Sequence, residues 1–583
     1  MASSKISPEQ LITDNLDIWT AAIEQKSTAG RGSSKKYSLH GIKKLRELIL
    51  ELAVRGKLVP QDPKDEPASV LLERIAAEKA QLIKDGKIKK QKPLPEIRED
   101  EKPCELPEGW EWAFNIELFR LTKGKKPNKL SENNIGYPYL DIEALDRHNI
   151  LKFTDDEKCP KSSINDIVVV CDGSRSGLVL DGKNGVIGST LAIINTPSYI
   201  QPFIKLFFQQ AYQRLNTSMK GAAIPHLDTK ALREDILAVP PLPEQHRIVA
   251  KVDELMSLCD ALEAQTESSI SAHQTLVTTL LDALLLPTGD SSSSGDDFQD
   301  NWQRISEHFD TLFTTAASID ALKQTILQLA VMGKLVPQDP NDEPAGKLLE
   351  RIAAEKAQLI KDKKIKKQKP LLEITEDEKP FELPEGWEWC RFEDIVDIQG
   401  GITKGRKLAG RELITVPYLS VANVQRSYLN LDFLKEVEIP AEEKEKYRVR
   451  KRDLLITEGG DWDKVGRTAI WSDELTYVGH QNHVFKARIF LEEQNEVWLE
   501  KYLNGPYARN YFAGSSKQTT NLASINKTQL RGCLIAIPPK KEIAFIMAKV
   551  DELMSLCDSL KARLTDAQTT QLHLADTLVK EAL

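Results

Sequence analysis

The feature that most constrains this 583-residue chain is an internal duplication. Residues 56–93 and 333–370 are identical at 34 of 38 positions, at an offset of 277. A second repeat has an offset of 298, since KVDELMSLCDALEA from Lys251 recurs as KVDELMSLCDSLKA from Lys549. The segments between these repeats barely align, and the second is 21 residues longer. A nearly identical frame with two dissimilar inserts predicts that the frame does the same job twice, while the inserts act on different targets.

Both copies of the second repeat lie in long helical patterns. After Pro243, apolar residues follow the alternating 4-3 spacing of a coiled-coil stripe, and the C-terminal copy keeps this spacing from Ile546 to Leu578. A helix of about 40 residues is about 60 Å long and cannot bury its stripe alone. We therefore expect the two helices to pack against each other, antiparallel, around a pseudo-twofold axis. The alternative is that each helix packs onto its own globular segment.

Each insert contains two polar loops that suit contact with DNA. A Gly-rich loop follows a buried-strand pattern at residues 172–177 and again at 458–467. An earlier loop carries several cations, at residues 122–128 and 401–407. Arginine pairs with guanine and Asn or Gln with adenine, while glycine lets the backbone approach a phosphate. Ordinary exposed turns have a similar composition, but the recurrence of both loops at corresponding places favours a binding function.

The side chains that we expect at this interface are polar or cationic. In the first insert they are Lys123, Lys125, Lys126, Asn128, Asp172, Ser174, Arg175 and Ser176. In the second insert they are Thr403, Lys404, Arg406, Asp461, Lys464, Arg467, Gln481 and Asn482.

The net charge of -8 argues at first sight against a nucleic-acid partner, because phosphate binding needs Lys and Arg. The distribution of the charge removes this objection. Residues 240–389 carry -12, whereas residues 113–239 and 390–537 carry +2 each. The acidic surplus therefore lies between two mildly basic inserts.

The cellular compartment is constrained by what the sequence does not contain. The seven cysteines are odd in number, scattered and never spaced as C-x-x-C, so we expect reduced, mostly buried thiols. The sequence has neither an apolar run that approaches the roughly 18 residues of a membrane span nor an apolar start of signal-peptide type. We therefore expect a cytoplasmic protein.

Several motifs resemble the specificity subunit of type I restriction-modification enzymes. They are the Leu-Pro-x-Gly-Trp-x-Trp openings at residues 106–112 and 383–389, the PPLPEQHRIVAKVDEL stretch from Pro240, and the duplication itself. The GKLVPQDP blocks at Gly56 and Gly333 look like one branch of that family. The resemblance covers essentially the whole chain.

The resemblance implies an α+β fold with two mixed α/β target recognition domains joined by long antiparallel coiled-coil spacer helices. Each domain would read one half of an asymmetric bipartite site in double-stranded DNA. Two modification subunits, which methylate adenine with S-adenosylmethionine, and two ATP-dependent restriction subunits would dock on the helical frame. The S-adenosylmethionine, ATP and Mg²⁺ are expected in those partners and not in this chain, which would be no enzyme. One departure is KKEI at residues 540–543, where the first copy has LPEQ.

We therefore expect the chain to comprise seven regions. They are an N-terminal helical region (1–104), the first insert (105–239), a spacer helix (240–286), an acidic Ser/Gly linker (287–300), a central helical region (301–381), the second insert (382–537) and a C-terminal spacer helix (538–583). The residues expected to dock partners are Ile248, Val252, Leu255, Leu262, Val550, Leu553 and Leu560.

Two other functions compete with DNA reading. Glu458, Asp461 and Asp463 could hold Mg²⁺ for phosphodiester cleavage, but the first insert offers only Asp172 at the corresponding place. A coiled-coil scaffold without DNA binding would leave the two dissimilar inserts unexplained. The sequence therefore favours polar readout of DNA.

The motif GHQNH contains His480 and His483, which could bind a metal. Two histidines without a nearby third ligand are weak evidence for a metal site. Together with Gln481 and Asn482, they favour a strand edge that contacts bases.

Overall fold

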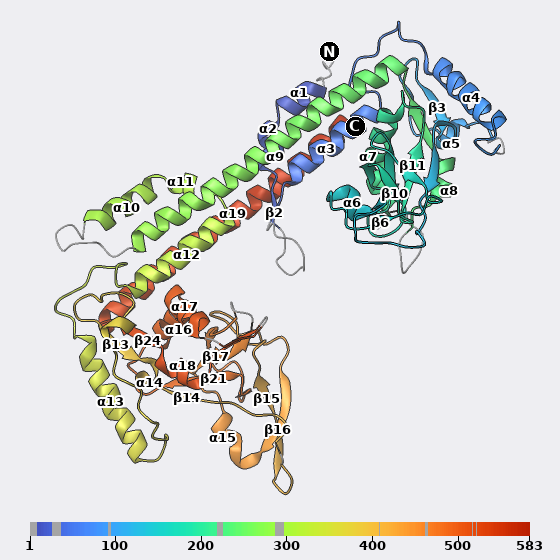
Figure 1. Cartoon of the computed structure of the whole chain (residues 1–583). Coiled ribbons are helices and arrows are strands. Elements are labelled where there is room, and N and C mark those ends of the chain that lie inside the picture. The colour runs from blue at the N-terminus through green and yellow to red at the C-terminus, as the bar shows by residue number, and fades with distance from the viewer. Residues whose placement is uncertain are drawn as a thin grey trace. The chain divides into compact units, whose positions relative to one another are not determined.

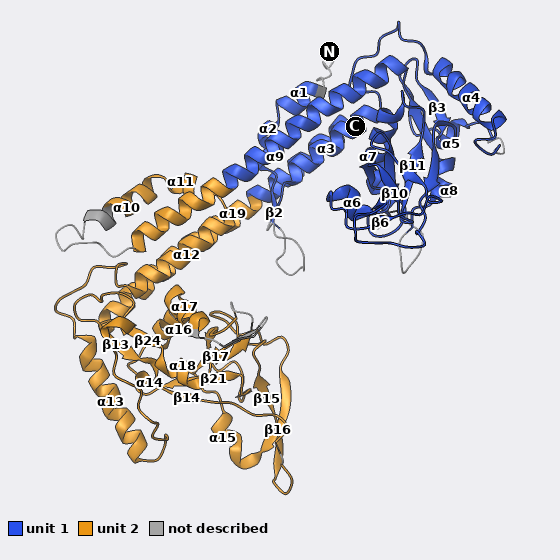
Figure 2. Cartoon of the chain, viewed as in Figure 1, with its two compact units in different colours: residues 1–270, 567–583 blue, residues 271–566 orange. Residues whose placement is uncertain are grey.

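A computed structural model describes residues 8–25, 37–90, 95–217, 226–285, 296–406, 408–460, 464–515, 517–519 and 522–583. It combines helices and sheets, as the α+β prediction requires, and it separates into two compact units (Figure 2). Unit 1 comprises residues 1–270 and 567–583, and unit 2 comprises residues 271–566. Within the described residues, no helix has the length and apolar character needed to cross a membrane. All seven cysteines are thiols, and six of them are buried, as predicted.

Helices form the part of the frame that belongs to unit 1 (Figure 1). The apolar face of α3 (His40–Val54) shares a core with Trp19 and with the first half of α9 (Leu242–Leu285). The last turns of α19 (Lys540–Ala582) join this core through Leu572. One apolar face per helix is what the periodic sequence predicts. The other elements here are α1 (Pro8–Thr13), α2 (Leu16–Ala21), β1 (Glu24–Gln25) and β2 (Tyr37–Ser38).

The first insert is built around an antiparallel sheet with the strand order β4-β11-β8-β9. All four residues of β8 (Ile167–Val170) are buried, as expected of the apolar run IVVV. A second sheet has the order β6-β5-β10-β7, in which β5 and β10 are parallel. The strands β3 and β12 pair antiparallel and bring the two ends of the insert together.

The remaining strands of the first insert are β3 (Glu111–Phe114), β4 (Arg120–Lys123), β5 (Tyr137–Leu140), β6 (Phe153–Thr154), β7 (Lys161–Ser162), β9 (Val179–Asp181), β10 (Gly185–Ile187), β11 (Leu191–Asn195) and β12 (Ile236–Val239). The helices in and beside it are α4 (Ala68–Lys84), η1 (Glu99–Glu101), α5 (Asn115–Leu118), α6 (Ile142–Asp146), α7 (Gln201–Thr217) and α8 (Thr229–Glu234).

The second insert has the same central strand order, here β14-β21-β17-β19. Its second sheet, β16-β15-β20, again contains one parallel pair, β15 with β20. The strands β13 and β24 close the insert as β3 and β12 close the first. The dissimilar sequences of the two inserts therefore share the strand order of the central sheet, although the second sheet has one strand fewer in the second insert, which also contains a third sheet, β18-β23-β22.

The strands of the second insert are β13 (Glu388–Arg391), β14 (Val396–Gln399), β15 (Leu413–Leu419), β16 (Lys435–Pro440), β17 (Leu454–Thr457), β18 (Gly459–Gly460), β19 (Thr468–Ile470), β20 (Gly479–His480), β21 (Val484–Ile489), β22 (Lys517–Thr519), β23 (Leu522–Ser524) and β24 (Leu534–Ile537). Its helices are α14 (Phe392–Ile395), η3 (Ala441–Glu443), α15 (Lys444–Tyr447), α16 (Glu496–Asn504), α17 (Pro506–Ser515) and α18 (Lys527–Gly532).

One glycine in each insert shows how closely the two folds correspond. A Cβ on Gly124 would lie 2.2 Å from the carbonyl oxygen of Gly188. A Cβ on Gly401, at the 277-residue offset, would lie 2.2 Å from the carbonyl oxygen of His480. Only glycine fits this approach of the cationic loop to the parallel strand.

Unit 2 contains the other part of the helical frame. Leu281 at the end of α9 shares a core with Ile326 of α12 (Ala316–Val331) and with Cys557 of α19. The linker predicted at residues 287–300 is shorter than expected, because α10 (Asp296–Glu307) begins within it, while residues 287–295 lie outside the described residues. The other helices are α11 (Phe309–Leu312), α13 (Ala345–Lys361) and η2 (Glu376–Glu378).

The side chains predicted to dock partners lie inside these cores. The apolar stripes of α9 and α19 are used for packing within each unit, so they do not form a surface that another subunit can reach. This corrects the docking prediction for the four buried residues, whereas docking through the three partly buried ones stays a prediction. Ile248, Val252, Leu255 and Val550 are buried, and Leu262, Leu553 and Leu560 pack partly buried against the same clusters.

Candidate nucleic-acid interface

The predicted loops of the first insert meet at one end of its central sheet. Lys123, the last residue of β4, pairs with Ala192 near the start of β11. Val170, the last residue of β8, pairs with Leu191 at the start of β11. Because β11 is antiparallel to both β4 and β8, the loops that follow β4 and β8 and the loop that precedes β11 leave the sheet at the same end.

The second insert repeats this arrangement. Gln399 at the end of β14 pairs with Lys486, and Thr457 at the end of β17 pairs with Val484. The backbone N–H of Asn482 donates to the carbonyl of Ile402 over 3.0 Å, so the loop after β14 lies beside residues 481–482. The structure thus brings together segments that are about 80 positions apart in the sequence.

Lys123 and Asp172 form a charged cluster with a residue that the sequence did not single out. Lys123 Nζ lies 3.1 Å from Asp172 Oδ2, and His226 Nδ1 lies 2.7 Å from Asp172 Oδ1. Burial raises the pKa of Asp172, but hydrogen bonds from His226 and Lys123 outweigh it, and the pKa lies below its usual value. An isolated histidine gives no sequence signal. In the structure, a β-bridge between Asp172 and His226 places this histidine beside the loop.

Some polar side chains of the Gly-rich loop in the first insert form hydrogen bonds within the protein. Arg175 binds Asp146 through both terminal nitrogens, at 2.8 and 3.0 Å. The fully buried Ser176 hydroxyl donates to the carbonyls of Cys171 and Gly173. Ser176 therefore shapes the loop and does not present its hydroxyl to DNA, which corrects that prediction. Ser174 is exposed at the loop's tip.

The other predicted residues of the first insert lie on its cationic loop. Lys125, Lys126 and Asn128 are exposed. The backbone N–H of Asn128 donates to Asp156 Oδ2 over 3.1 Å, which fixes the loop while the lysines project from it. This loop therefore offers exposed positive charge suited to phosphates.

The cationic loop of the second insert is more strongly anchored. Thr403 and Lys404 are exposed, and Lys404 Nζ lies 4.7 Å from the centre of the Tyr418 ring. Arg406 donates to Glu443 over 2.9 Å, and this hydrogen bond, together with one from Arg411, lowers the pKa of Glu443 to about 2. Arg406 is thus charge-paired in this structure, whereas Lys404 keeps its ammonium at the surface.

Arg467 and Arg175 contact corresponding turns in the two inserts. Arg467 Nη1 donates to Gln425 Oε1 over 2.6 Å. Gln425 lies in the turn after β15, as Asp146 lies at the end of α6 after β5. The partner is an amide in one insert and a carboxylate in the other. The arginines at corresponding positions of the two loops therefore have different hydrogen-bond partners.

The other predicted residues of the second insert lie close to Arg467 in sequence or on the β20–β21 turn. Lys464 is exposed, and Gln481 and Asn482 are half-buried on that turn. Asp461 lies outside the described residues, so its placement stays a prediction.

The two histidines of GHQNH have different environments. His480 is fully buried and its Nδ1–H donates to the carbonyl of Val484 over 2.7 Å, so it does not form the predicted base-contacting edge. His483 is exposed, with its Nδ1 2.6 Å from Glu458 Oε2. Among the described residues, no group of three His, Cys, Asp or Glu side chains could hold a metal. Asp461 and Asp463 lie outside that part of the chain.

Burial makes His480 a source of acid sensitivity. Burial, with a smaller contribution from the charge of Lys486, lowers the pKa of His480 to about 3. Below about pH 6.5 the unfolded chain binds a proton here and the folded chain does not, so stability falls as the pH drops toward 3. Between pH 7 and pH 5 this histidine should cost about 2 kcal/mol. We expect His480→Gln to reduce the pH dependence of the free energy of unfolding by that amount, measured by urea denaturation. Identical pH slopes in both proteins would contradict this assignment.

Together, the fold and the loops define a class: a chain with two like-folded inserts that present polar, cationic loops, carried on a duplicated helical frame. The family model of the type I restriction modification DNA specificity domain matches residues 107–272 and 384–566. The chain therefore belongs to this family and is a specificity subunit of a type I restriction-modification system, which recognises DNA targets.

Individual relatives agree with this assignment. The specificity subunits of the type I restriction enzymes EcoAI and EcoEI, both from Escherichia coli, are 42% and 40% identical to this chain. The alignments cover 99% of this chain in both cases, and 100% and 99% of the two relatives. A solved chain from a study of complex assembly and conformational transition of the type I R-M system has 17% identity and a TM-score of 0.44, with 82% of this chain and 99% of that chain covered.

Proposed function

We propose that the chain reads a bipartite, asymmetric target in double-stranded DNA, one half with each insert. The observation that carries this proposal is the pair of inserts with one strand order and different side chains at the same end of the sheet. A shared scaffold places both sets of loops in the same way, while the different loops select different bases. A single contiguous target would give no reason for two inserts with different loops.

The long helices act in this proposal as an antiparallel spacer with pseudo-twofold symmetry. Within unit 1, the end of α19 packs into the core that holds the start of α9. Within unit 2, the first half of α19 packs with the end of α9. Contacts in this order support the proposed antiparallel arrangement of the two helices. Their length would set the number of uncontacted base pairs between the half-sites.

Catalysis belongs in this proposal to partner subunits in the cytoplasm. Two modification subunits would bind S-adenosylmethionine and methylate adenine, and two restriction subunits would use ATP and Mg²⁺. The relatives are named as specificity subunits of restriction enzymes, which supports a targeting role for this chain. Because the apolar stripes are buried, partners would dock on other faces of the frame. Exposed apolar residues on these helices are Leu276, Phe545, Leu556 and Leu574.

Mapping methylated adenines in cells with and without this gene tests the proposal. We expect the gene to be required for methylation at a two-part sequence with a fixed gap. The purified chain alone should neither cut nor methylate duplex DNA. Methylation at a contiguous sequence, or activity of the isolated chain, would contradict the proposal.

Arg467→Ala should weaken recognition of one half-site only, by about 1 to 3 kcal/mol if the guanidinium reads a base. The matched control is Arg175→Ala, since Arg175 contacts the corresponding turn of the first insert. The two variants should affect opposite half-sites in a binding assay with targets mutated in one half. Equal losses at both half-sites for either variant would refute this assignment.

A further inference from the structure

A buried carboxylate lies where the first insert joins the frame. Glu244, in the first turn of α9, is 1% exposed. Its Oε2 accepts a hydrogen bond from Trp110 Nε1 over 3.0 Å, and its Oε1 accepts one from Gln61 Nε2 over 3.2 Å. Trp110 directly precedes the first strand of the insert, and Gln61 belongs to the repeated frame block. Three segments that are distant in sequence thus meet at one carboxylate.

Unit 2 contains the same arrangement in its own residues. Glu542, in the first turn of α19, is 3% exposed. It accepts hydrogen bonds from Trp387 Nε1 over 3.0 Å and from Gln338 Nε2 over 3.3 Å. We call this arrangement the Trp–Glu–Gln joint, which is Gln61, Trp110 and Glu244 in unit 1 and Gln338, Trp387 and Glu542 in unit 2. The joint is the same although the inserts that it holds differ.

The frame block is shaped around the indole ring of the joint. Gly56 has φ +66°, and a Cβ there would lie 2.8 Å from Trp110 Cζ2. Gly333 has φ +68°, and its Cβ would lie 3.1 Å from Trp387 Cζ2. Gln61 Nε2 also donates to the carbonyl of Gly56 over 2.7 Å. Each tryptophan therefore has a fixed position against the frame as well as against the carboxylate.

The polar character of the joint needs a reason, because burying a carboxylate is costly. Burial raises the pKa of both Glu244 and Glu542 above the usual value, despite the hydrogen bonds that each receives. Apolar residues of similar size would hold the same segments together at lower cost. Apolar contacts, however, have no preferred angle. Two hydrogen bonds to the two oxygens of one carboxylate fix the orientation of the donor side chains.

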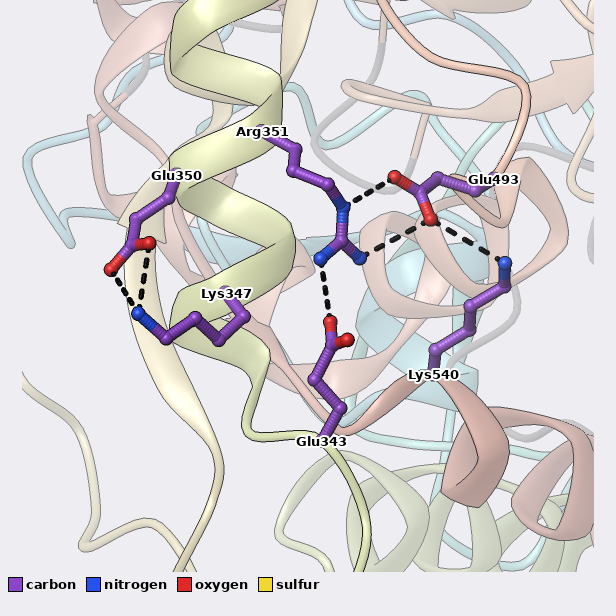
Figure 3. A network of polar contacts seen from close by, with 6 residues as sticks. All are labelled: Glu343, Lys347, Glu350, Arg351, Glu493 and Lys540. Atoms are coloured by element: carbon purple, nitrogen blue, oxygen red, sulfur yellow. Dashed lines mark hydrogen bonds and ion pairs between the residues drawn. The ribbon is translucent and has the colours of Figure 1, made fainter.

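Exposed ion pairs around the joint differ between the units. Arg351 of α13 binds Glu493 of the second insert over 2.7 Å and Glu343 over 2.7 Å, and both contacts are drawn in Figure 3. Lys540, at the start of α19, lies 3.5 Å from Glu493. In unit 1 the corresponding Arg74 binds Glu66 over 2.8 Å. Solvent-exposed pairs of this kind contribute little, so the buried joint is the feature that both units share.

We propose that the Trp–Glu–Gln joint is a positioning device that fixes the direction in which each insert leaves its long helix, and so sets the spacing at which two half-sites are accepted. This inference rests on the proposed bipartite function. The joint is suited to it because it connects the start of an insert with the helix that follows its end, while β3 and β12, or β13 and β24, hold those ends side by side. The residues of the joint are positioning residues, and the bases themselves are read elsewhere.

The test is Glu244→Gln in the complex with the modification subunit. The amide keeps the shape of the side chain, but its NH₂ group must face one of the two donors, so one hydrogen bond is lost. We expect unchanged base preference at both half-sites. We also expect the affinity for targets with one base pair more or less in the gap, relative to the native gap, to rise about fivefold. Glu542→Gln should have the same effect through the second joint.

Matched controls separate positioning from general damage. Glu254→Gln changes the same residue type on the same helix, where the exposed side chain pairs with Lys251, and should leave the spacing profile unchanged. Trp110→Phe removes the donor and keeps a ring in place, so it should reproduce Glu244→Gln even if that variant folds poorly. If both joint variants lose affinity for all gaps in the same proportion, or show the wild-type profile, the proposal is overturned. If the wild-type complex itself shows no bipartite preference, the proposed function fails instead.

Discussion

Arg488→Met is expected to lower the free energy of unfolding of unit 2 by about 3 to 5 kcal/mol. The fully buried carboxylate of Asp453 accepts two hydrogen bonds from Arg488, at 2.7 and 2.6 Å, and one from the backbone N–H of Arg450 at 2.8 Å. Removal of the guanidinium leaves a charge in the core of the second insert without its counter-ion. Chemical denaturation of the purified variant measures the loss.

A matched control tests whether burial is the cause. Arg175 also binds a carboxylate through two nitrogens, but the Arg175 side chain is 43% exposed. Arg175→Met should therefore cost less than about 1 kcal/mol. The double variant Asp453→Leu, Arg488→Met should regain much of the lost stability, because it removes both charges. Equal losses for Arg488→Met and Arg175→Met would contradict the explanation by burial.

Lengthening α9 and α19 together by one heptad is expected to abolish binding to the natively spaced target while leaving the bases read at each half unchanged. Seven helical residues add about 10 Å. At 3.4 Å per base pair, this corresponds to at most about three base pairs. Binding to a set of targets that differ only in the length of the gap measures the new optimum. An unchanged optimum would exclude the spacer model.

Both helices must be lengthened because both contribute to the cores of the two units. Leu572 of α19 lies in the core of unit 1 with α9, and Cys557 of α19 lies with Leu281 of α9 in unit 2. A heptad added only to α9 would remove one of these sets of contacts. That variant should lose stability as well as binding, which distinguishes it from the paired insertion.

The sequence predicted well those features that depend on local periodicity. The helix expected from Glu244 to about Leu286 is found from Leu242 to Leu285. The buried strand expected at residues 164–171 is found at Ile167–Val170. These elements could be predicted because an apolar stripe or an apolar run is formed by residues that are close together in the sequence.

Features that depend on tertiary contacts could not be predicted in this way. The burial of His480 and of the Ser176 hydroxyl is set by strands and loops that are not their neighbours in sequence. The pairing of Asp172 with His226 joins positions 54 residues apart. The parallel pairing of β5 with β10 could not be predicted either, because β5, with the sequence YPYL, is short and only partly buried. The sequence therefore predicted the polar loops. It did not predict which of their side chains form contacts within the protein.

The adjacent attachment points of each insert have a consequence for how new specificities arise. Because β3 lies beside β12, and β13 beside β24, an insert leaves the frame almost where it began. If each insert reads one half of the target, as proposed above, a genetic exchange between such boundaries would replace one half of the recognised sequence and leave the helices of the frame unchanged. Under that proposal, recombination would generate new combinations of half-sites without any change in the rest of the chain.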